Sequence, residues 1–170
     1  MIEYHPFKPF IPESSNTLII GSFPGKQSTQ KPKDKDWFYS ASRNQFWKIL
    51  EIVFEKNLSS FNDKQQILRE NKIAITDIIL SCERKENKNS DVNLINKKYN
   101  QEAIDLILTK NPISKILFTS KGVYQEFLEN FNKPRNVELI VLPSPSPIYR
   151  RLNLKDKAVE YKKFLLKNDN

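Results

Sequence analysis

Cysteine, histidine and glycine are scarce in this sequence of 170 residues, which contains one cysteine, one histidine and three glycines. A single cysteine, Cys82, excludes an intramolecular disulfide, a cysteine-based zinc site and a cysteine-ligated iron–sulfur cluster, and it suits a reducing compartment. No apolar run approaches membrane-spanning length, and the first twelve residues do not resemble a signal peptide because they carry His5, Lys8 and three prolines. These absences predict a cytoplasmic protein without a membrane partner.

Positive charge, by contrast, is concentrated in two segments. The net charge is +8, and residues 26–48 and 148–163 each contain six basic and two acidic residues, so that the rest of the chain is neutral. Such confinement indicates a surface for a polyanion. Ordinary use of lysine in a sequence rich in lysine and asparagine would explain it equally well.

Short apolar runs alternate with segments of helical periodicity along the chain. The runs are typical of buried strands, and the longer segments place their apolar side chains on one helix face. Predicted strands cover residues 17–21, 73–80, 115–119 and 137–142, and predicted helices cover residues 43–56, 63–71 and 154–167, with a fourth ending near residue 131. The alternation predicts one α/β domain over residues 1–170, with a mainly parallel four-stranded sheet between helices. Residues 83–98 are expected to form a polar connection without regular structure.

Two of the three glycines bound the loop that follows the first predicted strand, Gly21-Ser22-Phe23-Pro24-Gly25. Ligands of parallel sheets bind at the carboxyl ends of the strands. Glycine permits positive φ angles and close backbone approach, so the N–H groups of this loop could point at a carbonyl or a phosphate. A plain tight turn is the alternative interpretation.

The loop after the last predicted strand contains three prolines in six residues, 142–147, and continues into Ile148-Tyr149-Arg150-Arg151. A rigid loop with serine hydroxyls could bind backbone phosphates, while an apolar or aromatic side chain enters a base stack and the arginines supply charge. A proline-rich connection with Tyr149 packed on the surface is the alternative.

Tyr39 and Asn44 lie between the two loops, in the segment Trp37–Trp47. A base extruded from a duplex needs an aromatic platform and an amide that can read its edge. An asparagine at the start of a helix is also a common helix cap.

The combination of GSFPG after a strand, FYSASRNQFWKIL and VLPSPSP resembles the uracil-DNA glycosylase superfamily, in particular its mismatch-specific uracil and hypoxanthine-DNA glycosylase branches. The likeness begins at His5-Pro-Phe and continues through Thr76-Asp-Ile and Ser81-Cys-Glu into the last helix. It implies a three-layer α/β/α fold and a monofunctional enzyme that flips deaminated bases, hypoxanthine and also uracil, and hydrolyses their N-glycosidic bonds. It further implies a monomer that needs no metal or other cofactor and acts on double-stranded DNA, associated with the nucleoid, in base excision repair.

The resemblance also implies roles for individual residues. Tyr39 corresponds to the stacking platform and Asn44 to the base-edge or catalytic amide. The first loop would line the base pocket with Gly21, Ser22, Phe23, Pro24 and Gly25. The residues expected to contact DNA are Lys26, Ser28, Arg43, Ser144, Ser146, Ile148, Tyr149, Arg150 and Arg151.

This chain departs from the uracil-specific relatives at two places. Phe23 replaces the asparagine or aspartate that positions the attacking water, and Leu142 replaces the histidine or asparagine that opens the second loop. These departures favour the hypoxanthine branch and leave Asn44 as the catalytic candidate. Close relatives often have His-Pro where this chain has Ala41-Ser42, a difference that bears on detailed specificity. His5 lies far from both loops in the sequence, and either Asp77 or Asp91 could activate water if it reached the pocket.

Two other functions remain compatible with these features. One is a non-catalytic protein that binds damaged DNA and keeps the same scaffold. The other is an α/β nucleotide-binding protein unrelated to DNA, although it would leave the confined positive charge unexplained.

Overall fold

The central layer of the protein is a parallel sheet of four strands, as the alternation of strands and helices predicts. The computed structural model describes residues 1–30, 36–88 and 90–166. The strands of this sheet lie in the order β3 (Ile73–Asp77), β2 (Thr17–Gly21), β6 (Lys115–Phe118) and β7 (Glu138–Val141). All three pairings are parallel. Every residue of β2 is buried, which explains why this strand reads as a continuous apolar run.

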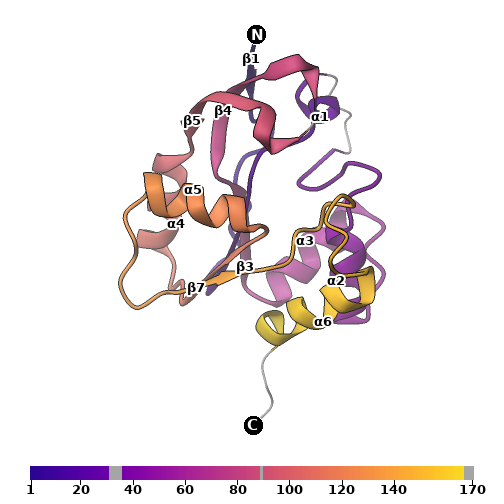
Figure 1. The fold of residues 1–170 in the computed structure, drawn as a ribbon. Helices are drawn as coiled ribbons and strands as arrows, with labels where there is room; N and C mark the ends of the chain where they lie inside the picture. The colour runs from indigo at the N-terminus through magenta and orange to yellow at the C-terminus, as the bar shows by residue number, and fades with distance from the viewer. Residues whose placement is uncertain (31–35, 89, 167–170) are drawn as a thin grey trace.

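Helices cover both faces of the sheet and complete three layers (Figure 1). Alternate side chains of β2 point to opposite faces, so Ile19 belongs to one apolar cluster and Leu18 and Ile20 to another. The Ile19 cluster is closed by α2 (Phe46–Phe54), α3 (Phe61–Glu70) and α6 (Leu154–Leu165), and the other cluster by α4 (Gln101–Lys110) and α5 (Lys121–Asn130). The predicted α/β/α class is thereby confirmed.

A second, antiparallel sheet of three strands corrects the prediction for residues 83–98. Its strands lie in the order β1 (Ile2–Tyr4), β4 (Ile79–Arg84) and β5 (Leu94–Tyr99). The single strand predicted over residues 73–80 is two strands, β3 and β4, that belong to different sheets. The segment expected to lack regular structure contains β5 and two 3₁₀ turns, Lys85–Asn87 and Asp91–Asn93. Strand β5 was missed because only Leu94 is buried in it, and its other side chains are half-buried or exposed.

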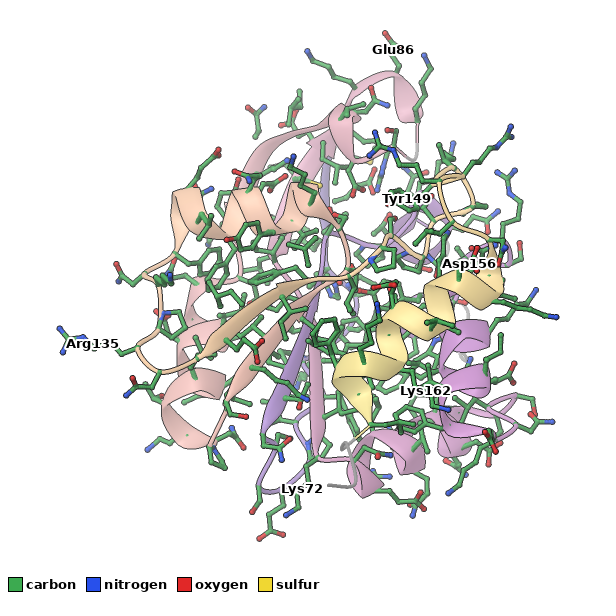
Figure 2. All side chains as sticks on the ribbon, turned by 60° about the horizontal axis from the view of Figure 1, so that its bottom comes forward. Lys72, Glu86, Arg135, Tyr149, Asp156 and Lys162 are labelled. Atoms are coloured by element: carbon green, nitrogen blue, oxygen red, sulfur yellow. The ribbon has the colours of Figure 1, made fainter. Side chains whose placement is uncertain are left out.

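The parallel order brings the carboxyl ends of the central strands to one edge of the sheet. Gly21 and Asp77 are paired at this edge, and β6 and β7 end beside them at Phe118 and Val141. A short helix, α1 (Lys26–Gln30), follows the first loop. Figure 2 shows Tyr149, from the loop after β7, in the upper half of the view and Lys72, which precedes β3, at the bottom. Within the described ranges, none of the helices is long and apolar enough to cross a membrane.

Candidate active site

Gly21 allows three chain segments to meet at the carboxyl edge of the central sheet. A Cβ atom at Gly21 would lie 2.2 Å from the hydroxyl oxygen of Tyr39 and 2.3 Å from Oδ1 of Asp77. Among the described residues no glycine has a positive φ, so Gly21 and Gly25 do not use the positive φ angles that glycine permits. The requirement at Gly21 is close approach, because any side chain would displace the tyrosine or the carboxylate.

Tyr39 is held over this edge by its neighbours and by a strained backbone. Its ring stacks on Phe46, the first residue of α2, with centroids 4.0 Å apart and an interplanar angle of 20°. Its hydroxyl donates to Oγ1 of Thr119 at 3.2 Å. The φ angle of Tyr39 is 59°, which is unusual for an aromatic residue and is typical of functional sites. Burial, together with the negative charge of Asp77, raises the pKa of this tyrosine well above its ordinary value.

Asn44 is half-buried at the start of α2, where its amide has a fixed orientation. Its Oδ1 accepts a hydrogen bond from the N–H of Phe46 at 2.9 Å. Because the oxygen is bound to the helix start, Nδ2 is the atom of this amide that can donate to a ligand. The next residue, Gln45, donates its backbone N–H to the carbonyl of Pro145 at 2.9 Å. The start of α2 therefore contacts the second loop directly.

Lys157 of α6 binds both the start of α2 and the second loop. Its side chain is 1% exposed, and its Nζ donates to Oε1 of Gln45 at 2.8 Å and to the carbonyl of Ser146 at 3.0 Å. The ammonium also lies 5.4 Å from the ring centroid of Tyr149. Burial lowers the pKa of Lys157. This lysine therefore stabilises the second loop instead of adding to the exposed positive surface.

The second loop presents apolar and basic side chains to solvent. The hydroxyl oxygens of Ser144 and Ser146 accept backbone N–H groups from Ser146 and Ile148, at 3.2 and 3.3 Å, which gives the loop a fixed shape. Ile148 is 79% exposed, and Arg150 and Arg151 are also exposed. A large apolar side chain left in solvent beside two arginines fits a surface that meets DNA.

The first loop is fixed by a buried ion pair between the antiparallel strands. Arg84 of β4 donates to both carboxylate oxygens of Glu3 in β1 and to the carbonyl of Pro24 in the loop. Burial alone would raise the pKa of Glu3, but hydrogen bonds from Arg84 and Thr29 and the charge of Arg84 hold it below its ordinary value.

The described residues of the first basic segment differ in how far they are exposed. Arg43 is exposed and Lys26 is half-buried at the start of α1, whereas Ser28 is only 5% exposed. The side chain of Ser28 is therefore not part of the exposed surface of α1. Three lysines of the first basic segment, Lys31, Lys33 and Lys35, lie outside the described residues.

His5 and Asp77 form a buried pair at this edge that the sequence reasoning did not find. Nε2 of His5 lies 2.8 Å from Oδ2 of Asp77, and the two side chains are 4% and 7% exposed. The histidine is therefore part of the site although 72 residues separate it from its partner. The sequence contains two signals for this pair, the motif His5-Pro-Phe and an aspartate at the end of an apolar run. Neither signal indicates that the two residues are in contact.

Asp91 also reaches the first loop. The hydroxyl of Ser22 donates to its carboxylate. Asp91 is an exposed residue, but its carboxyl group is partly desolvated, and this desolvation raises its pKa. The negative charge of Asp77 raises the pKa of Asp91 further. Both aspartates considered as groups that could activate water thus lie near the first loop.

Two further features lie outside this chemistry. Burial raises the pKa of Cys82 to about 11, which disfavours the reactive thiolate. In the part of the chain that the structure describes, no group of three His, Cys, Asp or Glu side chains could hold a metal ion.

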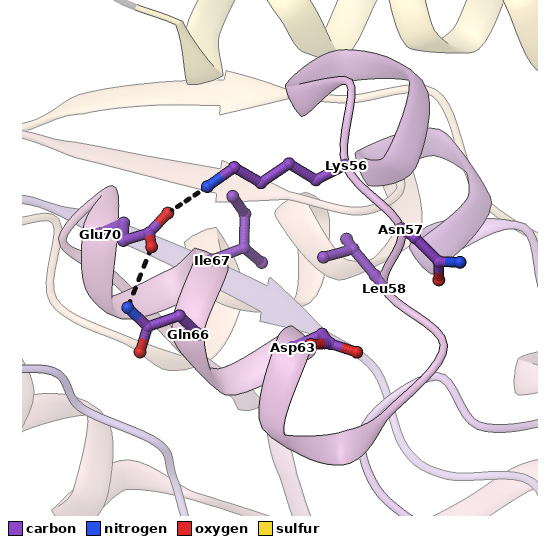
Figure 3. Close-up of a pocket in the computed structure, with 7 residues that line it drawn as sticks. All are labelled: Lys56, Asn57, Leu58, Asp63, Gln66, Ile67 and Glu70. Carbon is purple, nitrogen blue, oxygen red and sulfur yellow. Dashed lines mark hydrogen bonds and ion pairs between the residues drawn. The ribbon is translucent and has the colours of Figure 1, made fainter.

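A hollow between the end of α2 and α3 is separate from the candidate site (Figure 3). Its polar side chains already bind one another, because Glu70 accepts from Lys56 at 2.7 Å and from Gln66 at 2.9 Å. Glu70 ends the helix that leads into β3, so this hollow lies toward the edge where that strand begins. The residues that line it are Lys56, Asn57, Leu58, Asp63, Gln66, Ile67 and Glu70.

Comparisons with known proteins cover almost the whole chain. A model of the uracil DNA glycosylase superfamily matches residues 8–167. A hypoxanthine DNA glycosylase of Methanosarcina barkeri (strain Fusaro / DSM 804) is 30% identical over 149 residues, which cover 85% of this chain and 87% of that protein. An NMR structure of a Methanosarcina acetivorans protein, provisionally named a uracil DNA glycosylase, has a TM-score of 0.74 at 23% identity, with 97% of both chains covered. The likeness to the NMR structure concerns the fold.

Proposed function

Because this chain belongs to the uracil DNA glycosylase superfamily and is a DNA glycosylase, we propose that it flips hypoxanthine out of double-stranded DNA and hydrolyses its N-glycosidic bond. The name of the Methanosarcina barkeri relative supports hypoxanthine as the substrate. The absence of a polar group at Phe23 and Leu142, where uracil-specific relatives have one, supports the same choice. We propose that uracil is a secondary substrate and that the protein acts as a monomer.

The observation that carries this proposal is the position of Tyr39. Its ring packs on Phe46 of α2, and its hydroxyl reaches the backbone of Gly21 in the first loop. A ring fixed from behind in this way can stack on a base that has left the duplex. The first loop, through Ser22, Phe23, Pro24 and Gly25, would form the wall of the same pocket.

Asn44 is the residue to which we assign the catalytic contact. The base leaves as an anion when the glycosidic bond breaks, and a fixed N–H donor stabilises that charge in the transition state. The hydrogen bond from Phe46 to Oδ1 orients the amide before the substrate binds, so that Nδ2 can donate to the base. Preorganisation of this kind avoids reorienting the amide during the reaction.

The second loop and the exposed basic residues would hold the duplex. Ile148 is the candidate for the wedge that fills the place of the extruded base, with Tyr149 beside it. Phosphates would be bound by side chains on both basic segments and by the serine–proline loop. The residues in this proposed surface are Lys26, Arg43, Ser144, Ser146, Arg150 and Arg151.

A panel of duplexes tests the proposal. Purified protein is incubated with duplexes that carry hypoxanthine, uracil, xanthine or a thymine mismatch, and abasic sites are then cleaved with alkali. We expect cleavage at hypoxanthine first, followed by uracil. Intact strands in all four duplexes, with undisturbed binding to DNA, would instead identify a protein that binds damaged DNA without releasing the base.

A further inference from the structure

Lys157 connects two segments to which the function proposed above assigns separate roles. Its Nζ donates to Oε1 of Gln45, the residue after Asn44, at 2.8 Å. It also donates to the carbonyl of Ser146, two residues before the wedge candidate Ile148, at 3.0 Å. A single ammonium group therefore joins the neighbour of the catalytic candidate to the loop that carries the wedge.

The contacts of Lys157 lie on both sides of Ile148 along the chain. The hydroxyl oxygen of Ser146 accepts the N–H of Ile148 at 3.3 Å. The ring of Tyr149, the next residue, has its centroid 5.4 Å from the ammonium. The side chain of Ile148 itself is 79% exposed. The backbone around the wedge candidate is thus bound by Lys157 while its side chain projects into solvent.

The second loop is also held by bonds that do not involve Lys157. The buried hydroxyl of Tyr161 donates to the carbonyl of Pro143 at 3.0 Å. The backbone N–H of Gln45 donates to the carbonyl of Pro145 at 2.9 Å. Figure 2 shows Asp156, in the first turn of α6, near Tyr149 of this loop. The course of the loop is therefore set by several contacts, and Lys157 adds the side-chain connection to Gln45.

The position of Lys157 is unfavourable for a positive charge. The side chain is 1% exposed and lies in the first turn of α6, where the helix dipole favours negative groups. The ion pairs found among the described residues do not include it. A buried cation without a carboxylate partner destabilises a fold through its lost hydration. Stability alone therefore does not explain why this position holds a lysine.

Resting on the proposed function, we propose that Lys157 is a positioning residue that fixes the second loop relative to Asn44. Its two hydrogen bonds keep the wedge candidate Ile148 and the start of α2 at a constant separation. The amide of Asn44 then meets the base that the wedge has displaced from the duplex. Such alignment is worth much to a reaction, since a misplacement of about 1 Å can slow it about 100-fold.

Lys157→Met separates this role from support of the fold. Methionine is similar in length to the lysine stem and is an equally good helix former. Neither acceptor is left stranded, because the Ser146 carbonyl still accepts the N–H of Tyr149 at 3.2 Å and the half-buried Gln45 can turn its oxygen to water. We therefore expect a urea midpoint equal to or higher than that of the unaltered protein. Single-turnover release of hypoxanthine should nevertheless fall by at least about tenfold.

Base extrusion provides a second readout that does not require bond cleavage. A 2-aminopurine placed next to hypoxanthine in the duplex fluoresces more strongly when its neighbour leaves the stack. We expect this rise with the unaltered protein and the loss of most of it with Lys157→Met, because the wedge is no longer aligned with the base. Binding to an undamaged duplex, and its dependence on salt, should not change, because a buried ammonium meets no phosphate.

A second substitution tests the other end of the connection. Gln45→Met removes the side-chain acceptor and keeps the backbone N–H that binds Pro145. It should slow base release as well. The double variant Gln45→Met/Lys157→Met should match Lys157→Met within about twofold, because both substitutions break the same contact. Lys162→Met, an exposed lysine in the last turn of α6, is the matched control and should leave release and fluorescence unchanged.

The outcomes distinguish this inference from the proposed function. If the unaltered protein releases none of the four panel bases, the proposed function is wrong, and a fluorescence rise that Lys157→Met removes would still support a role of Lys157 in extrusion. If it gives neither release nor a rise, both proposals are wrong. If it releases hypoxanthine and Lys157→Met does so at the same rate, the inference is wrong and the proposed function stands. A Lys157→Met variant that does not fold, or that loses stability and activity together, would make Lys157 an ordinary structural residue and overturn the inference.

Discussion

The guanidinium of Arg84 donates to both carboxylate oxygens of Glu3, from Nε at 3.2 Å and from Nη2 at 3.1 Å. Both side chains are buried, at 3% and 5% exposure, and Nη2 also donates to the carbonyl of Pro24. The first loop is thus attached to the antiparallel sheet by a charged pair. This sheet contributes directly to the geometry of the candidate active site.

We expect Glu3→Gln to destabilise the protein by about 3–5 kcal/mol, because it leaves the charge of Arg84 buried without its partner. The free energy of unfolding, measured in urea, provides the test. Glu86→Gln is the control, since Glu86 forms an exposed pair with Lys88 and should change the stability by less than about 1 kcal/mol. Equal effects of the two substitutions would contradict the role of the buried pair.

The same pair predicts how stability depends on pH. The pKa of Glu3 in the folded protein is held below its ordinary value of 4.5. Its ionised form therefore stabilises the fold above pH 4.5, and this contribution is lost as the pH falls through the lowered pKa. Glu3→Gln should flatten the decline in unfolding free energy below pH 4.5, measured by urea titrations at successive pH values. A decline as steep as in the unaltered protein would show that other carboxylates cause it.

Local patterns predicted the central layer of this fold because the evidence for each element lies within the element. Strand β2 is buried on both faces and reads as an apolar run, and α2 has its apolar residues at helical spacing. Strand β5 has no such pattern, since Asn96 and Lys98 are exposed at a sheet edge and Lys97 is half-buried in an ion pair with Glu126. The break between β3 and β4 is hidden because Ile78 and Ile79 continue the apolar run that begins with Ile73, Ala74 and Ile75, and all five are buried.

The candidate site was predicted only where its residues lie within one motif. The glycine loop, Tyr39 and Asn44 could be named from their local sequence. The pairing of His5 with Asp77 depends on how β1 and β3 are placed in space, and no periodicity records that contact. For Gly21, close approach was among the expected reasons, but its partners, the side chains of Tyr39 and Asp77, could not be read from a single loop.

Gly21→Ala should disrupt the site, since the new methyl group would overlap the Tyr39 hydroxyl and the Asp77 carboxylate. We expect a loss of stability of about 1–3 kcal/mol, as for other insertions into packed regions, and a large fall in the rate of base release. Gly122→Ala is a matched control, because the nearest atom to its new Cβ is 3.8 Å away and the residue lies in α5. This control should be neutral or stabilising by up to about 1 kcal/mol. Full activity in Gly21→Ala would refute the close approach described for this edge.

Asn44→Ala should reduce the single-turnover rate of base release by about 100-fold or more, as expected when a preorganised donor to a developing charge is removed. Binding to the same duplex should change little, because Asn44 is half-buried and is not assigned to the phosphates. Asn57→Ala is the matched control, since its Oδ1 also accepts a backbone N–H two residues onward, from Ser59 at 2.9 Å. If both variants released the base as fast as the unaltered protein, Asn44 would be a helix cap without a catalytic contact.

The last prediction concerns the exposed arginines of the second loop, Arg150 and Arg151. Each phosphate contact releases about one counterion, so the slope of log K against log salt changes by about 0.9 for every contact removed. The double variant Arg150→Ala/Arg151→Ala should therefore flatten that slope by about 2, whichever base the duplex contains. Fluorescence anisotropy over a range of salt concentrations measures this slope. The control is Lys162→Ala/Lys163→Ala, which removes the same charge from the last turn of α6. The net charge changes equally in both variants. An equal effect on the slope would therefore mean that DNA binding depends on the overall charge of the protein. A larger effect of the arginine variant would locate the phosphate contacts at the loop after β7.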